Sequence, residues 1–103
     1  MKIYNKVETI LDIKNKNKEE VFDSLTEIIL LLKHKIKDYE NTEYKLDLIQ
    51  LKNDVFSVVN SYHTFLNDKT KINELEKSVN VYNTRVKELK ERGIKLDSYS
   101  IGV

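Results

Sequence analysis

The spacing of the apolar residues constrains the fold most, because they recur in steps of three and four along most of the chain. The clearest case is an unbroken seam of the kind that one face of an α-helix buries. Gly93 follows it, where a helix often ends in a left-handed residue. We predict a helix over 69–92 and then a tail, 94–103, that either packs as an extended segment or frays. The seam comprises Ile72, Leu75, Val79, Tyr82, Val86 and Leu89.

Two further stretches show helical periodicity. The stretch 18–37 carries a broad apolar stripe that Leu30 and Leu31 widen, so we expect this helix to be central. In 43–64, Leu46, Leu51 and Val58 fall outside the main face and form a second one. The stripe of 18–37 comprises Val21, Phe22, Leu25, Ile28, Ile29, Leu32 and Ile36. The main face of 43–64 comprises Leu48, Ile49, Val55, Phe56, Val59 and Tyr62, and we expect it to build the core.

A fourth, shorter helix is predicted over residues 2–13 from Ile3, Val7, Ile10 and Leu11. No stretch alternates long enough to predict a strand. A length of 103 residues fits one domain with a modest core. With no proline and only two glycines, the composition suits helices joined by short turns. We therefore predict an all-α fold, a single bundle of about four helices over residues 1–93.

Several classes of function lack their usual sequence signals. The chain has no cysteine, which excludes disulfides and thiolate metal sites. Its longest apolar run, residues 28–32, is too short to cross a membrane. His34 and His63 lie on different predicted helices without metal-ligand spacing, and there is no phosphate-binding loop or nucleophile motif. We expect a soluble cytoplasmic protein that is not an enzyme, with no catalytic residue, metal or cofactor, and no membrane contact.

Charge is distributed unevenly although the chain as a whole carries only +1. Residues 38–47 hold four acids and one lysine, a local −3, whereas residues 85–95 hold five bases and two acids, a local +3. The bases complement the dipole at the end of a helix. They would also suit a weak contact with nucleic-acid phosphates, which positions a strand without reading its sequence. Both interpretations remain open.

The stretch IKDYENTEYKLDLIQLKND, residues 36–54, resembles regions 2.1 to 2.2 of bacterial RNA polymerase sigma factors. In housekeeping members a helix ends in basic residues, a turn follows, and the next helix begins Leu-Asp-Leu-Ile-Gln, as Leu46–Gln50 does here. The flanking stretches 13–36 and 67–93 are similar in order to small clostridial-type sigma factors. The resemblance covers roughly residues 10–92.

This resemblance implies a sigma region 2 fold that binds the coiled-coil clamp of the polymerase β′ subunit. The clamp-facing residues would be Asp47, Gln50, Asn53 and Asp54. The promoter-melting part would fall at about 72–92, with tentative nucleic-acid contacts from Tyr82, Arg85, Lys87, Lys90 and Arg92.

The chain departs from the family pattern in two ways. The aromatic cluster that stacks bases is missing apart from Tyr82, and there is no room for region 4, which reads the upstream promoter element. We therefore expect a region 2-only transcription cofactor, a fragment of a longer protein, or a mimic that blocks the clamp. The rival hypothesis is a small helical interaction module or phage-type inhibitor. It would self-associate as a homodimer, or bind a host protein, through the 72–89 seam.

Overall fold

Three long helices dominate the computed structural model, which describes residues 11–13, 16–96 and 99–102. They are α2 (Lys18–Asp38), α3 (Lys45–Asn67) and α4 (Ile72–Glu91), with a 3-10 turn, η2 (Lys69–Lys71), before α4. Two strands of two residues, β1 (Leu11–Asp12) and β2 (Ile101–Gly102), pair in parallel. The all-α prediction is thus confirmed.

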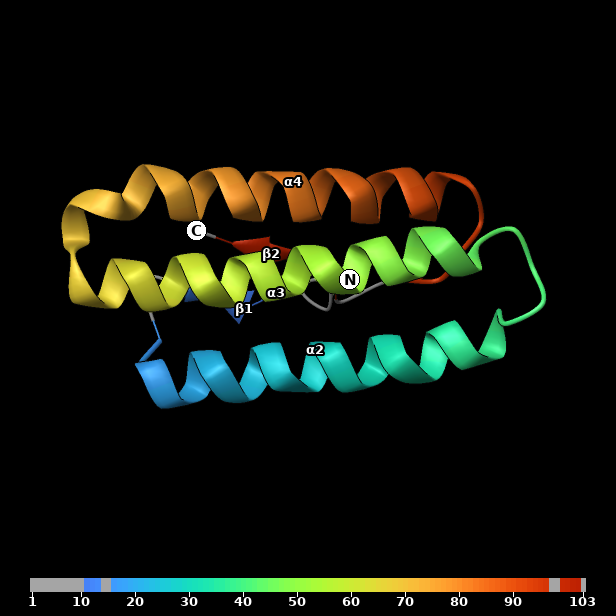
Figure 1. The fold of residues 1–103 in the computed structure, drawn as a ribbon, viewed down its shortest axis with the longest axis horizontal. Helices are drawn as coiled ribbons and strands as arrows, with labels where there is room; N and C mark the ends of the chain where they lie inside the picture. The colour runs from blue at the N-terminus through green and yellow to red at the C-terminus, as the bar shows by residue number, and fades with distance from the viewer. Residues whose placement is uncertain (1–10, 14–15, 97–98, 103) are drawn as a thin grey trace, which may run out of the picture.

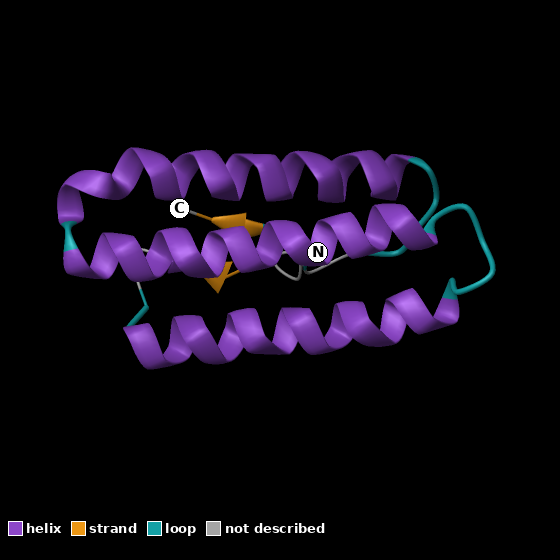
Figure 2. Cartoon of the chain, viewed as in Figure 1, coloured by secondary structure: helices purple, strands orange, loops and turns teal. Residues whose placement is uncertain are grey.

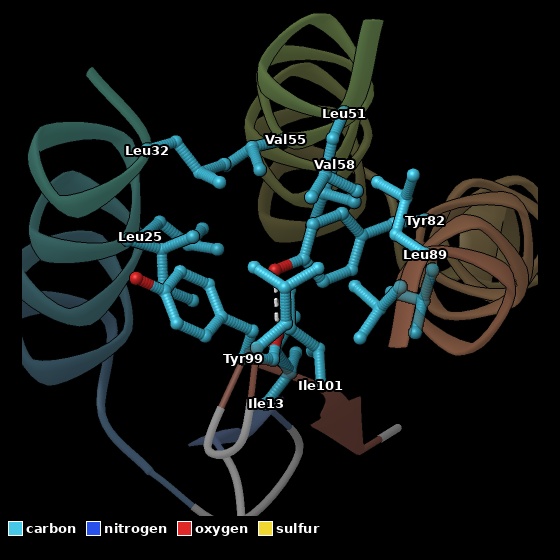
Figure 3. Close-up of a cluster of buried hydrophobic side chains, with 14 of the residues drawn as sticks. Ile13, Leu25, Leu32, Leu51, Val55, Val58, Tyr82, Leu89, Tyr99 and Ile101 are labelled. Atoms are coloured by element: carbon cyan, nitrogen blue, oxygen red, sulfur yellow. Dashed lines mark hydrogen bonds between the residues drawn. The ribbon is translucent and has the colours of Figure 1, made fainter. Parts of the chain in front are cut away.

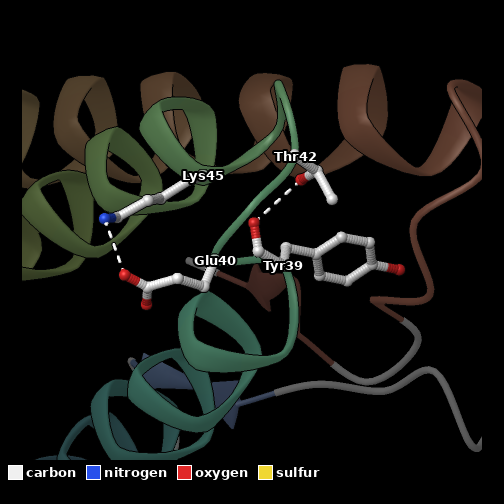
Figure 4. A network of polar contacts seen from close by, with 4 residues as sticks. All are labelled: Tyr39, Glu40, Thr42 and Lys45. Carbon is white, nitrogen blue, oxygen red and sulfur yellow. Dashed lines mark hydrogen bonds and ion pairs between the residues drawn. The ribbon is translucent and has the colours of Figure 1, made fainter.

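Local side-chain chemistry explains where the helices begin and turn. Asn17 starts α2 through a capping box, because its Oδ1 accepts the Glu20 amide at 2.9 Å and its own amide donates to Glu20 Oε1 at 3.3 Å. In the turn before α3, the Thr42 hydroxyl donates to the Tyr39 carbonyl at 2.8 Å (Figure 4). Across the same turn, Lys45 Nζ lies 3.1 Å from Glu40 Oε2.

The end of α4 explains the direction of the tail. Gly93 has φ +100°, as predicted for the residue after the helix. Its amide donates to the Lys90 carbonyl at 3.0 Å, and the Ile94 amide donates to the Leu89 carbonyl at 3.1 Å. These two bonds form a Schellman motif. The motif turns the chain back toward the bundle.

The helices run up, down and up, with α3 between α2 and α4 (Figures 1 and 2). The prediction that helix 18–37 is central is therefore wrong. Leu30 and Leu31 are exposed on α2 and do not widen its buried stripe. The short turns place α3 in contact with both neighbours, α2 and α4.

The tail and the strands close the side of the core opposite α3. Figure 3 shows Tyr99, Ile101 and Ile13 beneath the three helices, facing Leu51 and Val58. Of the two outcomes left open for residues 94–103, the described part adopts the extended packing. Its buried side chains are Ile94, Leu96, Tyr99 and Ile101.

The count of about four helices is not confirmed, because the described residues contain three long helices. Of the predicted helix 2–13, residues 2–10 lie outside the described residues, and residues 11–13 are not α-helical. Leu11 instead pairs with Ile101 in the parallel strands. Such a pairing joins residues from opposite ends of the sequence, and helical periodicity carries no signal for it.

The register of α3 also differs from the prediction. Leu48 and Val55 are buried as predicted, but Phe56, which we assigned to the core, is 46% exposed. A central helix buries the side that lies between its two neighbours, so Leu51 and Val58 point inward instead. The buried stripe is Leu48, Leu51, Val55, Val58 and Tyr62.

Candidate protein-interaction surface

The four residues predicted to face a partner do not share one surface. Gln50 and Asn53 are exposed on the outward face of α3, whereas Asp47 and Asp54 lie on the side facing α4. Asp54 is only 7% exposed. The structure therefore brings together two of the four residues and places the two carboxylates in contacts within the chain.

Asp54 forms the more buried of two ion pairs between α3 and α4. Its Oδ2 accepts from Arg85 Nε at 2.6 Å, and Arg85 is itself partly buried. A carboxylate that is nearly buried requires such a partner, because an unpaired charge there would lose its hydration without compensation. The pair holds the two helices together and commits Asp54 and the Nε atom of Arg85 to each other.

Asp47 forms the second pair, nearer the end of α4. Its Oδ2 accepts from Arg92 Nη2, and both side chains remain partly exposed. The Arg92 guanidinium also lies over the Tyr44 ring, 5.2 Å from its centre. This second pair is a surface contact, so Asp47 sits at the edge of the outward face rather than within it.

The tentative nucleic-acid residues are not gathered into one basic surface either. Arg85 and Arg92 are engaged by Asp54 and Asp47, while Lys87 and Lys90 line a shallow pocket near the tail together with Asn83 and Ser100. Two of the four bases in this set thus hold α3 against α4. This geometry favours the structural interpretation of the basic cluster.

Tyr82 is fully buried, which corrects its assignment as a base-stacking residue. Its hydroxyl donates to the Tyr99 carbonyl at 2.6 Å (Figure 3). Burial, with smaller contributions from Tyr99 and Asp54, raises the pKa of Tyr82 far above its ordinary value. Next to it, Asn83 Nδ2 donates to the Ile101 carbonyl at 2.6 Å and Asn83 Oδ1 accepts the Ile101 amide at 2.8 Å. Both residues attach the tail to α4.

The seam of α4 is packed inside the chain. Its members from Leu75 to Leu89 are buried, and Ile72 is partly buried against the same core. Self-association through this seam would require the bundle to open. The apolar seam of the alternative interface is therefore not on the surface of the folded domain.

Sequence reasoning missed the most distinctive surface, the outward face of α3. The most exposed residues of this helix include no Asp, Glu, Lys or Arg, and its Lys45, Asp47 and Lys52 are only partly exposed, whereas the exposed positions of α2 and α4 include charged residues. Two large apolar side chains of α3 are exposed to solvent, Leu46 at 75% and Phe56 at 46%. The exposed residues are Leu46, Gln50, Asn53, Phe56, Ser57, Asn60, His63, Thr64 and Asn67.

Such a face is unusual in a chain with 34% charged residues. The centres of protein interfaces are depleted in charged residues and enriched in aromatic ones, which is the character of this face. The signal was present in the sequence as an uncharged stripe at 46, 50, 53, 57, 60 and 64. This stripe was overlooked because helical periodicity assigned the neighbouring Phe56 to the core.

The two histidines lie apart on the surface of α2 and α3. His34 and His63 are both exposed, and His63 borders a shallow pocket of about 560 Å³ with Phe22 and Leu66. Among the described residues, no group of three or more His, Cys, Asp or Glu is arranged to hold a metal ion. Every buried side-chain nitrogen or oxygen described has a hydrogen-bond partner.

No protein-family model, curated protein or solved structure matches the chain. No helix among the described residues combines the length and apolar character needed to cross a membrane.

Proposed function

We propose that the chain is a non-catalytic protein-binding domain of the sigma region 2 type, which attaches to the β′ clamp of RNA polymerase through the outward face of α3. The observation that carries the proposal is the charge-free face with Leu46 and Phe56 exposed on it. Gln50 and Asn53, two of the residues that the sigma resemblance implies for clamp binding, lie on that face.

The proposal differs from a complete sigma factor in having no promoter-melting role. Tyr82 is buried, and Arg85 and Arg92 are paired with carboxylates of α3. DNA contact through these three residues is therefore not part of the proposed function. What remains is occupancy of the clamp, either as a cofactor or as a mimic that blocks it.

A binding titration of the chain against the isolated β′ clamp coiled coil tests the proposal. We expect saturable binding that Asn53→Lys weakens at least about tenfold, because a lysine buried in an uncharged interface loses hydration without a partner. Asn80→Lys is the matched control. It makes the same change at an exposed position of α4 and should bind like the unmodified chain.

Two results would contradict the assignment. If the chain shows no saturable binding to the clamp at tens of micromolar, the polymerase is not its partner. If Asn53→Lys and Asn80→Lys lose the same affinity for the clamp, the outward face of α3 is not the binding surface. The charge-free face would then favour the second candidate, a helical module that binds another host protein through the same side of α3.

A further inference from the structure

The hydrogen bonds from α4 to the tail end on the main chain of the tail. Tyr82 donates to the Tyr99 carbonyl, and the Asn83 amide group bonds both the carbonyl and the amide of Ile101. Ile101 is also the partner of Leu11 in the parallel strands. Main-chain groups are the same in every residue, so these contacts recognise an extended segment and leave the choice of sequence to other contacts.

The choice of sequence comes from three apolar side chains of the tail. Leu96 is completely buried, Ile101 is 2% exposed and Tyr99 is 8% exposed. Figure 3 shows them on the side of the bundle opposite α3, with the Tyr99 ring reaching toward Leu25 of α2. We call this side of the three helices the tail face. The ligand that fits it is an extended peptide with a leucine, an aromatic residue three positions later and an aliphatic residue two further on.

One turn determines whether the tail reaches the tail face of its own chain. Gly93 directs the tail back toward the bundle with φ +100°. A Cβ at this position would meet no other described atom within 4 Å, so the turn depends on the backbone conformation and not on space for a side chain. If residue 93 leaves the left-handed region, the tail points elsewhere and the tail face of that copy stays uncovered.

The tail of a second copy is the occupant for which the structure gives a direct fit. A copy that releases its tail uncovers one tail face and offers one segment that matches such a face. Two open copies therefore close each other with the same contacts that the tail makes within one chain. Exchange of an identical element between copies is a known route to a symmetric dimer. The open form occurs in every molecule during synthesis, because the tail is translated after α4.

We infer that the tail face is a peptide-binding site whose ligand is the tail of this chain, and that two copies exchange tails across it to form a dimer. Within one chain the tail is tethered, so its effective concentration is on the order of millimolar. The closed monomer therefore predominates in dilute solution. Exchange increases as the concentration of the chain approaches that value, or when the turn at Gly93 is disfavoured.

The exchanged dimer does not rest on the proposed function. It uses the side of the bundle opposite α3, so the outward face of α3 stays uncovered in monomer and dimer alike. Tail exchange is measured on the chain alone, and clamp binding is measured with the clamp. Failure of either measurement therefore leaves the other intact.

Substitution of Gly93 tests the exchange. Valine strongly disfavours the left-handed region, whereas asparagine enters it more readily than most residues with a side chain. We expect Gly93→Val to sediment as a dimer at about 50 µM, well below the effective concentration of a tethered tail. Gly93→Asn and the unmodified chain should sediment as monomers, with the same helical circular dichroism. A monomeric Gly93→Val chain would overturn the exchange.

A second substitution identifies the surface that the dimer uses. Ile101→Asp places a charge where the tail buries an aliphatic side chain, so the tail no longer fits either tail face. We expect the double variant Gly93→Val, Ile101→Asp to be monomeric. If the double variant remains a dimer, the copies associate through another surface and the inference is wrong.

The peptide-binding site can be tested without a dimer. In the full chain carrying Ile101→Asp, the tail face should be free to bind a fluorescent peptide with the sequence of residues 94–103, measured by anisotropy. The unmodified chain should bind this peptide at least about tenfold more weakly, because its own tail competes. A peptide with the same Ile101→Asp change is the matched control and should not bind. Equal binding of the two peptides, or no binding to the Ile101→Asp chain, would overturn the site.

Discussion

Two carboxylates on α3 form similar ion pairs in different surroundings. Asp54 and Asp47 are seven residues apart, and their arginines, Arg85 and Arg92, are also seven apart on α4. Only Asp54 is nearly buried. The energetic value of an ion pair depends on how much hydration its partners have lost, so the two pairs should contribute very differently to stability.

We predict that Asp54→Asn lowers the free energy of unfolding by about 2 kcal/mol, because it replaces a charged hydrogen bond by a neutral one and leaves Arg85 without a counter-charge. Asp47→Asn, which makes the same change at the exposed pair, should cost less than about 1 kcal/mol. Urea unfolding followed by circular dichroism measures both values. If the two variants lose the same free energy of unfolding, burial does not determine how much each ion pair contributes to stability.

The candidate site could be predicted from sequence only in part. Exposure of Gln50 and Asn53 agrees with the surface that we expected. Asp54 could not be placed correctly, because its burial depends on Arg85, 31 residues away in the chain. For Tyr82 the apolar seam indicated burial correctly, and only the nucleic-acid contact implied by the resemblance conflicts with that burial. Helical periodicity reports which residues share a face, but it does not report what lies against that face.

At the scale of the elements, the three long helices were predictable and the strands were not. The predicted ranges 18–37, 43–64 and 69–92 correspond to α2, α3 and η2 with α4, within a few residues at each end. Repeating apolar steps and caps such as Asn17 are local signals, so they can be read in one sequence. The pairing of Leu11 with Ile101 has no local signal, since the two positions differ by 90.

The tail should contribute to stability as a helix would. We predict that Leu96→Ala lowers the free energy of unfolding by about 3 kcal/mol, because Leu96 is completely buried and its removal leaves a cavity in the core. Its neighbour Lys95 is exposed, so Lys95→Ala should change the value by no more than about 0.5 kcal/mol. Chemical denaturation compares the two. A Leu96→Ala chain as stable as Lys95→Ala would show that the tail does not complete the core.

At the scale of the whole molecule, burial of tyrosines links folding to alkaline pH. Burial raises the pKa of Tyr82 far above the ordinary 10.0, and it also raises the pKa values of Tyr62 and Tyr99. The folded state therefore keeps protons that the unfolded state releases above about pH 10. The stabilisation is complete below that pH and is lost as the pH rises past it.

We predict that the free energy of unfolding of the intact chain falls above about pH 10, by at most about 1.4 kcal/mol per pH unit for each tyrosine kept protonated. Tyr82→Phe should be less stable near neutral pH, because it loses the hydrogen bond to the Tyr99 carbonyl. It should lose less stability on going to high pH. Urea titrations between about pH 8 and pH 12 distinguish the two chains, and identical alkaline slopes would contradict the role of Tyr82.

The pairing of strands from the two ends of the sequence also bears on how the chain is made. Helices α2, α3 and α4 form contacts between neighbours and can assemble as each leaves the ribosome. The side of the core opposite α3 is filled by Leu96, Tyr99 and Ile101, which are synthesised after all three helices. During synthesis this apolar side of the three helices therefore stays open until Leu96, Tyr99 and Ile101 have been translated, and their packing then protects it from other chains.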